Sequence, residues 1–552
     1  MCGETEVTVQ AGLEPCDPHK TPVLIIGQQK HLAQLSYSDI ACKLKSRVTQ
    51  EIWNHGVKSL QPSPTDTVSL YLNLCSVAAL PTKVSRHNTE SRAHSITKIV
   101  RSQTVAADEE YIVLVCERSS AYASVCAAAR AYPLYSRKSS VLKSKRRQKV
   151  IIEVVLSGST STTLDDDDIR TMKAAIYGLR LAARIVDTPA NEMTTIEFLK
   201  EIREVGKKLD IVPLVYEGEE LRKMGMGGLY GVGKAASTPP VLAVLSHRPE
   251  GATKRFAWVG KGIVYDTGGL SMKTKTTMPG MKRDCGGAAA VLGAFYHAVT
   301  CGFKEDLCAI FCLAENAVGP DATKPDDIHK LYSGRTVEIN NTDAEGRLVL
   351  GDGVAFALQD KCCDVIVDMA TLTGAQATAT GKYHAAILTN CPEMEECCVQ
   401  AGRSSGELNH PLVYTPELHF HEFASAVADM KNSAADRNNA ASSCAGLFIG
   451  AQLGFDYPGK WLHIDMASPV CMGERATGYG SSLLPVLFGE YTESQLLKSL
   501  APKLPKIEHI SKNNNKNDDV DNNGDMEPVR SATGKSELQD NDYPVHKKSR
   551  VQ

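Results

Sequence analysis

The chain has 552 residues, of which 43% are hydrophobic and 23% charged, and this composition is that of a globular protein with material for two or three domains. Its formal net charge of −3 gives no general attraction to nucleic acid or acidic membranes. No apolar run reaches the roughly 20 residues of a membrane span, and we expect no signal peptide at the N-terminus. The 17 cysteines are scattered, so we expect reduced, mostly buried thiols in a cytoplasmic protein.

The first 165 residues predict an α/β domain. Apolar runs at 23–27, 111–116 and 149–156 are typical of buried strands, and the alanine-rich segment 121–132 is typical of a helix. We expect this domain to serve assembly or regulation. A basic run at 136–149 interrupts it, and this run is either a solvated loop or a nucleic-acid contact.

A linker helix is predicted over 166–190. The polar, acidic stretch 156–168 precedes it, and carboxylates are favourable at a helix N-terminus. Apolar residues then recur at spacings of three and four, which makes one apolar stripe: Ile169, Met172, Ile176, Leu179, Ala183 and Val186. Pro189 ends the pattern, because proline disfavours a helical residue before it.

A larger α/β domain is predicted over 191–508, followed by a disordered tail at 509–552 that has almost no large apolar residues. Apolar runs at 255–260, 307–315, 365–374 and 461–467 each end in polar residues or glycine. Open α/β sheets place their chemistry at such strand ends. The expected fold class is therefore α/β, with two domains that are each a mixed sheet flanked by helices.

Charged residues gather at these predicted strand ends and at glycine-rich turns. Asp343 and Glu345 lie two positions apart, so in an extended segment they share a face, which Arg347 can join. The stretches 261–273 and 281–291 add two lysines and two further carboxylates: Lys261, Asp266, Lys273 and Asp284. One such acid alone is more often a cap or a surface ion pair. Four acids together repel one another unless cations lie between them, and a pair of divalent metal ions satisfies this need.

The motifs NTDAEGRL (341–348), KGIVYDTGGLSMK (261–273) and MKRDCGGAAA (281–290) resemble those of the leucyl aminopeptidases, the M17 metallopeptidases. The resemblance extends from about 170 to 500 and is closest to the eukaryotic "probable aminopeptidase-like" branch. Asp326 stands where many members have glycine.

This resemblance implies a two-metal site and a hydrolytic reaction. Lys261, Asp266, Asp284 and Glu345 are expected to hold one zinc ion, and Asp266, Asp343 and Glu345 a second, exchangeable ion that manganese or magnesium replaces. Lys273 and Arg347 match the catalytic positions, with a bicarbonate ion at Arg347. The substrates implied are short peptides, and the assembly implied is a homohexamer.

The expected substrate-binding residues are Lys273, Met281, Asn341, Thr371 and Gly374. Core packing explains Met281 and the turn at 371–374 equally well. Two other readings stay open at this point. One is a different two-metal hydrolase such as a phosphoesterase, and the other is a non-catalytic scaffold or nucleic-acid-binding hexamer that retains the metal site.

Overall fold

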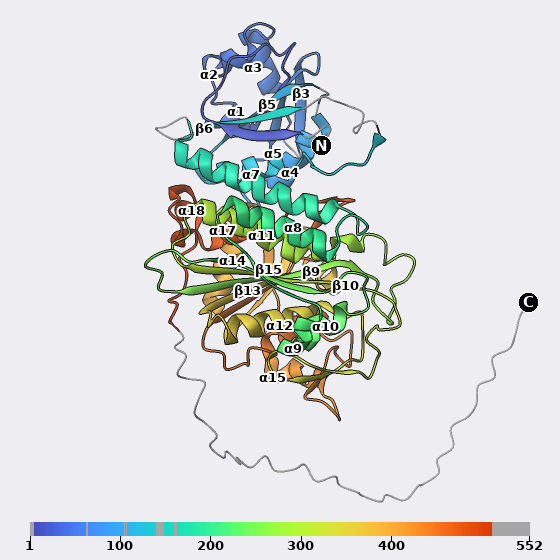
Figure 1. Cartoon of the computed structure of the whole chain (residues 1–552). Helices are drawn as coiled ribbons and strands as arrows, with labels where there is room; N and C mark the ends of the chain where they lie inside the picture. The colour runs from blue at the N-terminus through green and yellow to red at the C-terminus, as the bar shows by residue number, and fades with distance from the viewer. Residues whose placement is uncertain are drawn as a thin grey trace, which may run out of the picture. The chain divides into compact units, whose positions relative to one another are not determined.

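The computed structural model describes residues 5–61, 65–103, 105, 107–139, 148–158 and 163–509 (Figure 1). Apart from its first residue, His509, the predicted tail lies outside the described residues, and so does most of the basic run, at 140–147. Within the described ranges, no helix is both long enough and apolar enough to cross a membrane.

The described N-terminal residues form a six-stranded sheet in the order β1-β6-β5-β2-β4-β3. Neighbouring strands are parallel, except that β3 runs antiparallel to β4. The strands are β1 Glu6–Gln10, β2 Val23–Gln28, β3 Asp66–Tyr71, β4 Cys75–Leu80, β5 Glu109–Cys116 and β6 Lys149–Leu156.

Helices cover both faces of this first sheet, because successive residues of a strand point to opposite faces. Ile25 packs with Trp53 in one apolar cluster, whereas Ile26 packs with Ile96 in another. The helices are α1 Gln29–Leu32, α2 Tyr37–Leu44, α3 Gln50–Ser59, α4 Ala93–Gln103 and α5 Arg118–Ala129.

A long helix, α7 Asp166–Asp187, lies between the first sheet and the rest of the chain (Figure 1). Asp165 caps it by accepting a hydrogen bond from the backbone N–H of Asp168, as the acidic stretch before it indicates. The helix buries more than the one predicted stripe, since it contacts α5 on one side and α11 on the other. Gly178 allows the close approach to α11, because an added Cβ would lie 2.5 Å from the carbonyl oxygen of Gly293.

The second sheet has eight strands in the described chain, in the order β15-β14-β17-β13-β9-β10-β8-β7. Its centre, β10-β9-β13-β17, is parallel. The strands are β7 Leu214–Glu217, β8 Val241–His247, β9 Arg255–Asp266, β10 Asp306–Asn316, β13 Val365–Ala370, β14 Ala385–Thr389, β15 Asn409–Pro411 and β17 Lys460–Asp465. Strand β9 is longer than the predicted run, and the predicted strand at 365–374 ends earlier, at Ala370.

Two helical layers enclose this second sheet. One layer packs with α7 and comprises α8 Thr195–Lys208, α11 Gly286–Thr300, α14 Pro392–Ser405, α17 Leu483–Leu487 and α18 Gln495–Leu500. The opposite layer comprises α9 Glu219–Met224, α10 Gly227–Gly233, α12 Gly346–Gln359 and α16 Ala441–Ala451. The expected α/β class, with two mixed sheets flanked by helices, is confirmed. The predicted boundaries at 165, 190 and 508 stay predictions.

Short elements complete the described chain. They are β11 Ile328–Lys330, β12 Thr336–Glu338, β16 Met430–Lys431, β18 Cys471–Met472, β19 Arg475–Ala476, α13 Ala375–Thr380, α15 Pro416–His419 and the 3-10 turns η1 Met281–Cys285, η2 Phe420–Phe423 and η3 Gly489–Tyr491.

Candidate metal centre and active site

The predicted charged residues meet at the carboxyl edge of the second sheet. The parallel strands β9, β10, β13 and β17 end side by side there, with Asp266 opposite Asn316 and Ala370 opposite Asp465 in the register. Chemistry at the carboxyl ends of parallel strands is the rule for open α/β sheets. The sequence therefore predicted the correct edge.

A glycine turn after β9 brings Lys273 back over the strand end. Gly268 and Gly269 adopt φ of +83° and +62°, which side chains with a Cβ rarely tolerate. An added Cβ on Gly268 would also lie 2.8 Å from Asp343 Oδ1. The backbone N–H of Lys273 donates to the carbonyl oxygen of Thr267, which closes the turn.

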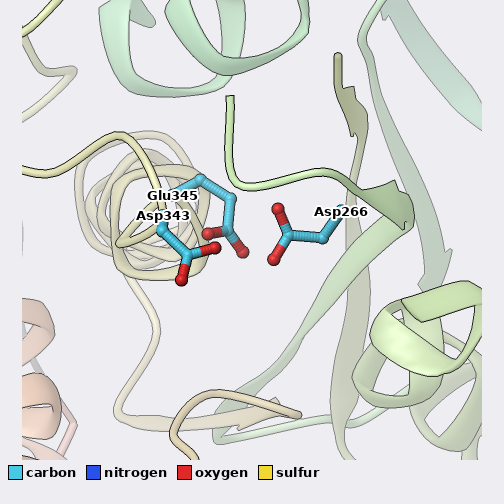
Figure 2. A group of neighbouring side chains, drawn as sticks. All are labelled: Asp266, Asp343 and Glu345. Carbon is cyan, nitrogen blue, oxygen red and sulfur yellow. The ribbon is translucent and has the colours of Figure 1, made fainter. Parts of the chain in front are cut away.

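Asp343 and Glu345 reach the site by a different route from the one predicted. The segment is not extended: it is a turn that runs directly into α12, and Glu345 has helical φ and ψ as the N-cap of that helix. Even so, Asp266, Asp343 and Glu345 each offer one oxygen, and these oxygens all lie within 4.8 Å of one another (Figure 2). The expectation that the two acids share a face because they are extended is wrong, but they do converge.

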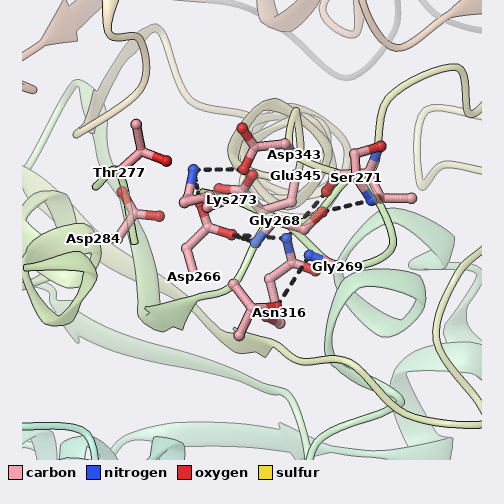
Figure 3. Close-up of polar contacts among 12 residues, drawn as sticks. Asp266, Gly268, Gly269, Ser271, Lys273, Thr277, Asp284, Asn316, Asp343 and Glu345 are labelled. Carbon is pink, nitrogen blue, oxygen red and sulfur yellow. Dashed lines mark hydrogen bonds and ion pairs between the residues drawn. The ribbon is translucent and has the colours of Figure 1, made fainter. Parts of the chain in front are cut away.

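Two lysines each bridge two carboxylates in this cluster. Lys261 Nζ lies 2.8 Å from Asp284 Oδ2 and 2.7 Å from Glu345 Oε1. Lys273 Nζ lies 2.8 Å from Asp266 Oδ2 and 2.5 Å from Asp343 Oδ1 (Figure 3). The four carboxylates therefore surround two neighbouring positions of positive charge. Carboxylate oxygens are suitable ligand atoms for divalent cations. The residues present fit a pair of metal ions.

The charges of the cluster do not balance. Burial and the neighbouring Glu345 raise the pKa of Asp266 to about 6, although both lysines oppose this shift. Burial also raises the pKa of Asp284 and of Glu345, although Lys261 opposes both shifts. Burial alone would lower the pKa of Lys261, but Asp284 and Glu345 outweigh it and raise that pKa. The carboxylates thus lack part of the positive charge that would stabilise their ionised forms.

Arg347 lies apart from the bridged carboxylates. Its side chain is buried in the first turn of α12, and Nε has no hydrogen-bond partner among the described residues. Burial lowers the pKa of Arg347 to about 10, while Glu345 and Asp465 oppose that shift. Arg347 is therefore charged at neutral pH and keeps a donor for an anion.

The turn after β13 supports two of the candidate metal ligands, Lys261 and Asp284. The Thr371 carbonyl oxygen accepts from Lys261 Nζ at 3.0 Å, and its hydroxyl donates to Asp284 Oδ1 at 2.8 Å. Asp465, at the end of β17, accepts from the backbone N–H groups of Leu372 and Thr373. Asp465 therefore supports this turn, a role that the sequence pattern did not predict.

Asn316, at the end of β10, was also missed. Its Nδ2 donates to Asp266 Oδ1 at 2.8 Å and to the carbonyl oxygen of Thr342 at 3.1 Å. One amide thereby joins Asp266 of β9 to the NTDAEGRL segment. Both Asn316 and Asp465 are the last residues of their strands in the structure, whereas the predicted runs 307–315 and 461–467 end elsewhere.

The remaining predicted substrate residues take varied positions. Asn341 Oδ1 accepts from the backbone N–H of Asp343, so it shapes the turn that presents this acid. Met281 is half-buried at the start of η1, and Gly374 is the N-cap of α13 with open space where a Cβ would point. These contacts leave the substrate roles of all three as predictions.

Gly346 makes room for Lys261. An added Cβ on Gly346 would lie 2.6 Å from Lys261 Cε and 2.7 Å from its Nζ. Lys261 has no freedom to move away, because Asp284, Glu345 and Thr371 all hold its ammonium group.

Comparison with known proteins agrees with the fold and the site. The catalytic-domain model of the cytosol aminopeptidase family matches residues 180–485, and the model of M17 aminopeptidase N-terminal domain 2 matches residues 21–141. The chain belongs to the M17 cytosol aminopeptidase family and is a metal-dependent aminopeptidase, a hydrolase.

Individual relatives place the chain within the family. It is 58% identical to the mouse protein "Probable aminopeptidase NPEPL1" over 493 residues, which are 89% of this chain and 94% of that one. It is 41% identical to leucine aminopeptidase 1 of Caenorhabditis elegans, over 90% of this chain and all of that one. The solved structure of that nematode enzyme superposes with a TM-score of 0.84 at 40% identity, over 89% of this chain and 100% of its own. Leucyl aminopeptidase from Trypanosoma brucei in complex with bestatin gives 0.76 at 32% identity, over 88% and 95%. The predicted branch of the family is confirmed.

Proposed function

We propose that the chain releases N-terminal amino acids from short peptides by means of two divalent cations and an activated water. The observation that carries this proposal is the convergence of four carboxylates and two lysines at one sheet edge, in a chain of an aminopeptidase family. Lys261, Asp266, Asp284 and Glu345 would hold one ion, zinc. Asp266, Asp343 and Glu345 would hold a second, which zinc, manganese or magnesium can supply.

The bound pair of cations would supply a water that is deprotonated near neutral pH and would polarise the scissile carbonyl. Lys261 can bind a metal ion only as a neutral amine, so its Nζ must release a proton on loading. Asp266 and Glu345 are shared between the two proposed ion sites, which accounts for their position between the two lysines.

Lys273 would stabilise the transition state. Its side chain is 14% exposed to solvent, whereas that of Lys261 is 3% exposed. It can therefore approach an oxygen of a bound substrate on which negative charge develops. A fixed donor aimed at such an oxygen is commonly worth about 3–4 kcal/mol.

Arg347 would hold a bicarbonate ion that takes and returns the proton of the attacking water. The support is a buried guanidinium that forms no ion pair with any described residue and has a free Nε donor. A planar oxyanion matches the fork of guanidinium donors.

The preference for a free N-terminus would come from the cations, because the lone pair of a neutral α-amine can bind one of them. An acetylated terminus and an internal peptide bond offer no such amine. The inhibitor complex of the Trypanosoma brucei relative supports a substrate site for peptide-like molecules in the family.

We also propose a homohexamer in the cytoplasm. The resemblance to M17 enzymes supports the assembly, and the name of the matching family, cytosol aminopeptidase, supports the location. Size-exclusion chromatography with light scattering tests the first point, and a monomer at micromolar concentration would contradict it.

The proposed activity is tested with a panel of amino-acid amides and dipeptides. Purified protein is stripped of metal and reloaded with zinc, manganese or magnesium, and N-acetylated substrates serve as matched controls. We expect cleavage that requires metal and fails on every acetylated substrate. Folded, metal-loaded protein that cleaves none of the panel would favour the non-catalytic scaffold instead. Cleavage of phosphate esters in place of peptides would favour a phosphoesterase.

A further inference from the structure

A crevice of about 420 Å³ lies between the N-terminal sheet and the layer of helices on the second sheet. The loop 84–91 and the first turns of α5 line one side, and the ends of α14 and α18 line the other. Its polar lining includes Arg86, Asn88, Ser119, Ser120, Arg403 and Ser404. No residue of the metal centre lines it.

The crevice continues into a second cavity of about 280 Å³, with which it shares Val84, Glu90, Ser91 and Ser120. This second cavity lies at the carboxyl ends of β2, β4 and β5. In the strand order, β4 lies on one side of β2 and β5 on the other, so the chain reverses direction across the sheet there. Such a switch point is where open α/β sheets bind ligands.

Two arginines give the crevice its charge. Arg403 Nη1 donates to the carbonyl oxygen of Arg86 at 3.5 Å, which holds both residues at the same place. Both side chains are exposed, and neither forms an ion pair with a carboxylate in the described ranges. Arg86 Nε donates to His87 Nε2 at 3.0 Å, and both guanidinium groups keep further N–H donors without a carboxylate partner among the described residues. Such donors are well suited to a ligand oxyanion.

Three histidines, His87, His384 and His410, lie near these two arginines. His384 Nε2 donates to the carbonyl oxygen of His87 at 2.7 Å, and the rings of His87 and His410 lie 5.1 Å apart. Desolvation lowers the pKa of His87, and Arg86, Arg403 and the other two histidines lower it further. These side chains are thus close enough to repel one another.

Nearby carboxylates do not neutralise the positive charge of the two arginines. Glu90 lines the crevice, and Glu395 of α14 interacts with His410. Glu117 is committed to Lys30 at 2.7 Å and His31 at 3.1 Å. Two arginines therefore face one carboxylate within the lining itself.

The first turns of α5 add neutral donors. The hydroxyls of Ser119 and Ser120 line the crevice, and the N-terminus of this helix favours a negative charge. Glu117, the N-cap residue, makes no capping bond, because it pairs with Lys30 and His31 instead.

We propose that this crevice binds a small organic anion, whose phosphate or carboxylate head group lies between Arg86 and Arg403 and whose body enters the adjoining cavity. The lining of that cavity combines apolar side chains such as Ile26, Leu80 and Leu114 with polar ones. Residues of both sheets' layers line the crevice, and residues of the N-terminal sheet and its helices line the cavity. Volumes of about 420 Å³ and 280 Å³ suit a small molecule better than a nucleic-acid strand. The site is separate from the peptidase reaction and does not depend on it.

Calorimetric titration of the full metal-loaded chain tests this proposal. The probes are inorganic phosphate, glycerol 3-phosphate and succinate at constant ionic strength, so that the phosphate and carboxylate arms are distinguished. We expect one saturable site with a Kd of 1 mM or below for at least one probe. The double variant Arg86→Gln, Arg403→Gln should raise that Kd at least tenfold while amide hydrolysis stays unchanged, which shows that the variant is folded.

The matched control is Arg203→Gln, which removes one exposed arginine of α8 far along the chain from the crevice. It should leave the Kd unchanged. Three results would overturn the proposal: no saturation with any probe, equal binding by the double variant, which would place the anion at the metal centre, or binding of a single-stranded RNA oligonucleotide without binding of the small anions.

Discussion

Both sheets bury lysine against carboxylate, but only the N-terminal sheet balances the charges. There, Lys43 Nζ lies 2.7 Å from Glu153 Oε2, and both side chains are fully buried. Gln10 and the backbone of Glu14 donate to the other oxygen of Glu153, and the Lys43 ammonium lies 3.2 Å from the centre of the Tyr111 ring. One cation pairs with one anion, and the second oxygen of the carboxylate accepts two hydrogen bonds.

The second sheet has two lysines among four carboxylates. Burial raises the pKa of Glu153 as well as those of Asp266, Asp284 and Glu345, so the two sites differ in the number of charges of each sign. The difference teaches how to tell a structural ion pair from a binding site in the same molecule. A balanced pair is complete by itself, whereas the unbalanced cluster stays costly until a ligand brings more positive charge.

Removing one carboxylate from the unbalanced cluster should have the largest effect. We expect Glu345→Gln or Asp343→Asn to reduce hydrolysis by more than about a thousandfold, because the bound metal would be lost. In the metal-free state the unfolding temperature should change little, since the substitution relieves repulsion. Activity assays with metal analysis check this. A variant that kept its metal and a tenth of the activity would contradict the ligand assignment.

Removing the cation from the balanced pair should instead cost stability. We expect Lys43→Met to destabilise the fold by about 3–5 kcal/mol, because it leaves Glu153 as an unpaired buried charge. Urea unfolding measures the loss, and the hydrolysis rate per folded molecule should not change. The double variant Lys43→Met, Glu153→Leu is the control and should recover most of the stability. If it did not, the pair would contribute more than charge balance.

Lys273→Ala tests a role in the reaction rather than in holding metal. We expect kcat to fall about 10²–10³-fold, because a donor to the developing negative charge is lost, while metal content changes little. The matched control is Lys275→Ala, an exposed lysine two residues further on. Loss of both metals with unchanged turnover per bound metal would show that the assigned role is wrong.

His297 offers a smaller test at the junction of the two regions. This residue of α11 stacks on Tyr122 of α5, with ring centroids 6.0 Å apart, and burial lowers the pKa of its imidazole to about 4. An unfolded histidine has a pKa of about 6.5, so the unfolded state takes up the proton first as pH falls. Stability is therefore lost between pH 6.5 and 4, by about 2 kcal/mol at pH 5.

His297→Phe should remove that loss, because it keeps an aromatic ring but cannot bind a proton. Unfolding curves at pH 7 and pH 5 for both proteins measure it. An equal acid sensitivity in the variant would assign the effect to the carboxylates of the metal centre.

The strand ends and the charged residues were predictable, because apolar runs and glycine turns mark them locally. Asn316 and Asp465 were not predictable. Each lies at the end of an apolar strand, and its contacts form only when the four parallel strands lie in register. Asp326, which replaces a common glycine, adopts φ of +76°, so the fold demands the left-handed conformation that aspartate tolerates better than most residues. The neighbouring positions of Arg86 and Arg403 follow from tertiary packing alone, since 317 positions separate them.

Gly346 offers a position at which one substitution should give a catalytically inactive variant of this enzyme. Replacing it with alanine would add one methyl group against an ammonium that three partners hold in place. Every charged side chain of the centre would remain in the sequence, so the surface that a peptide meets would stay nearly the same. Such an inactive variant is suited to isolating peptides from cells, because it is designed to bind them without hydrolysing them.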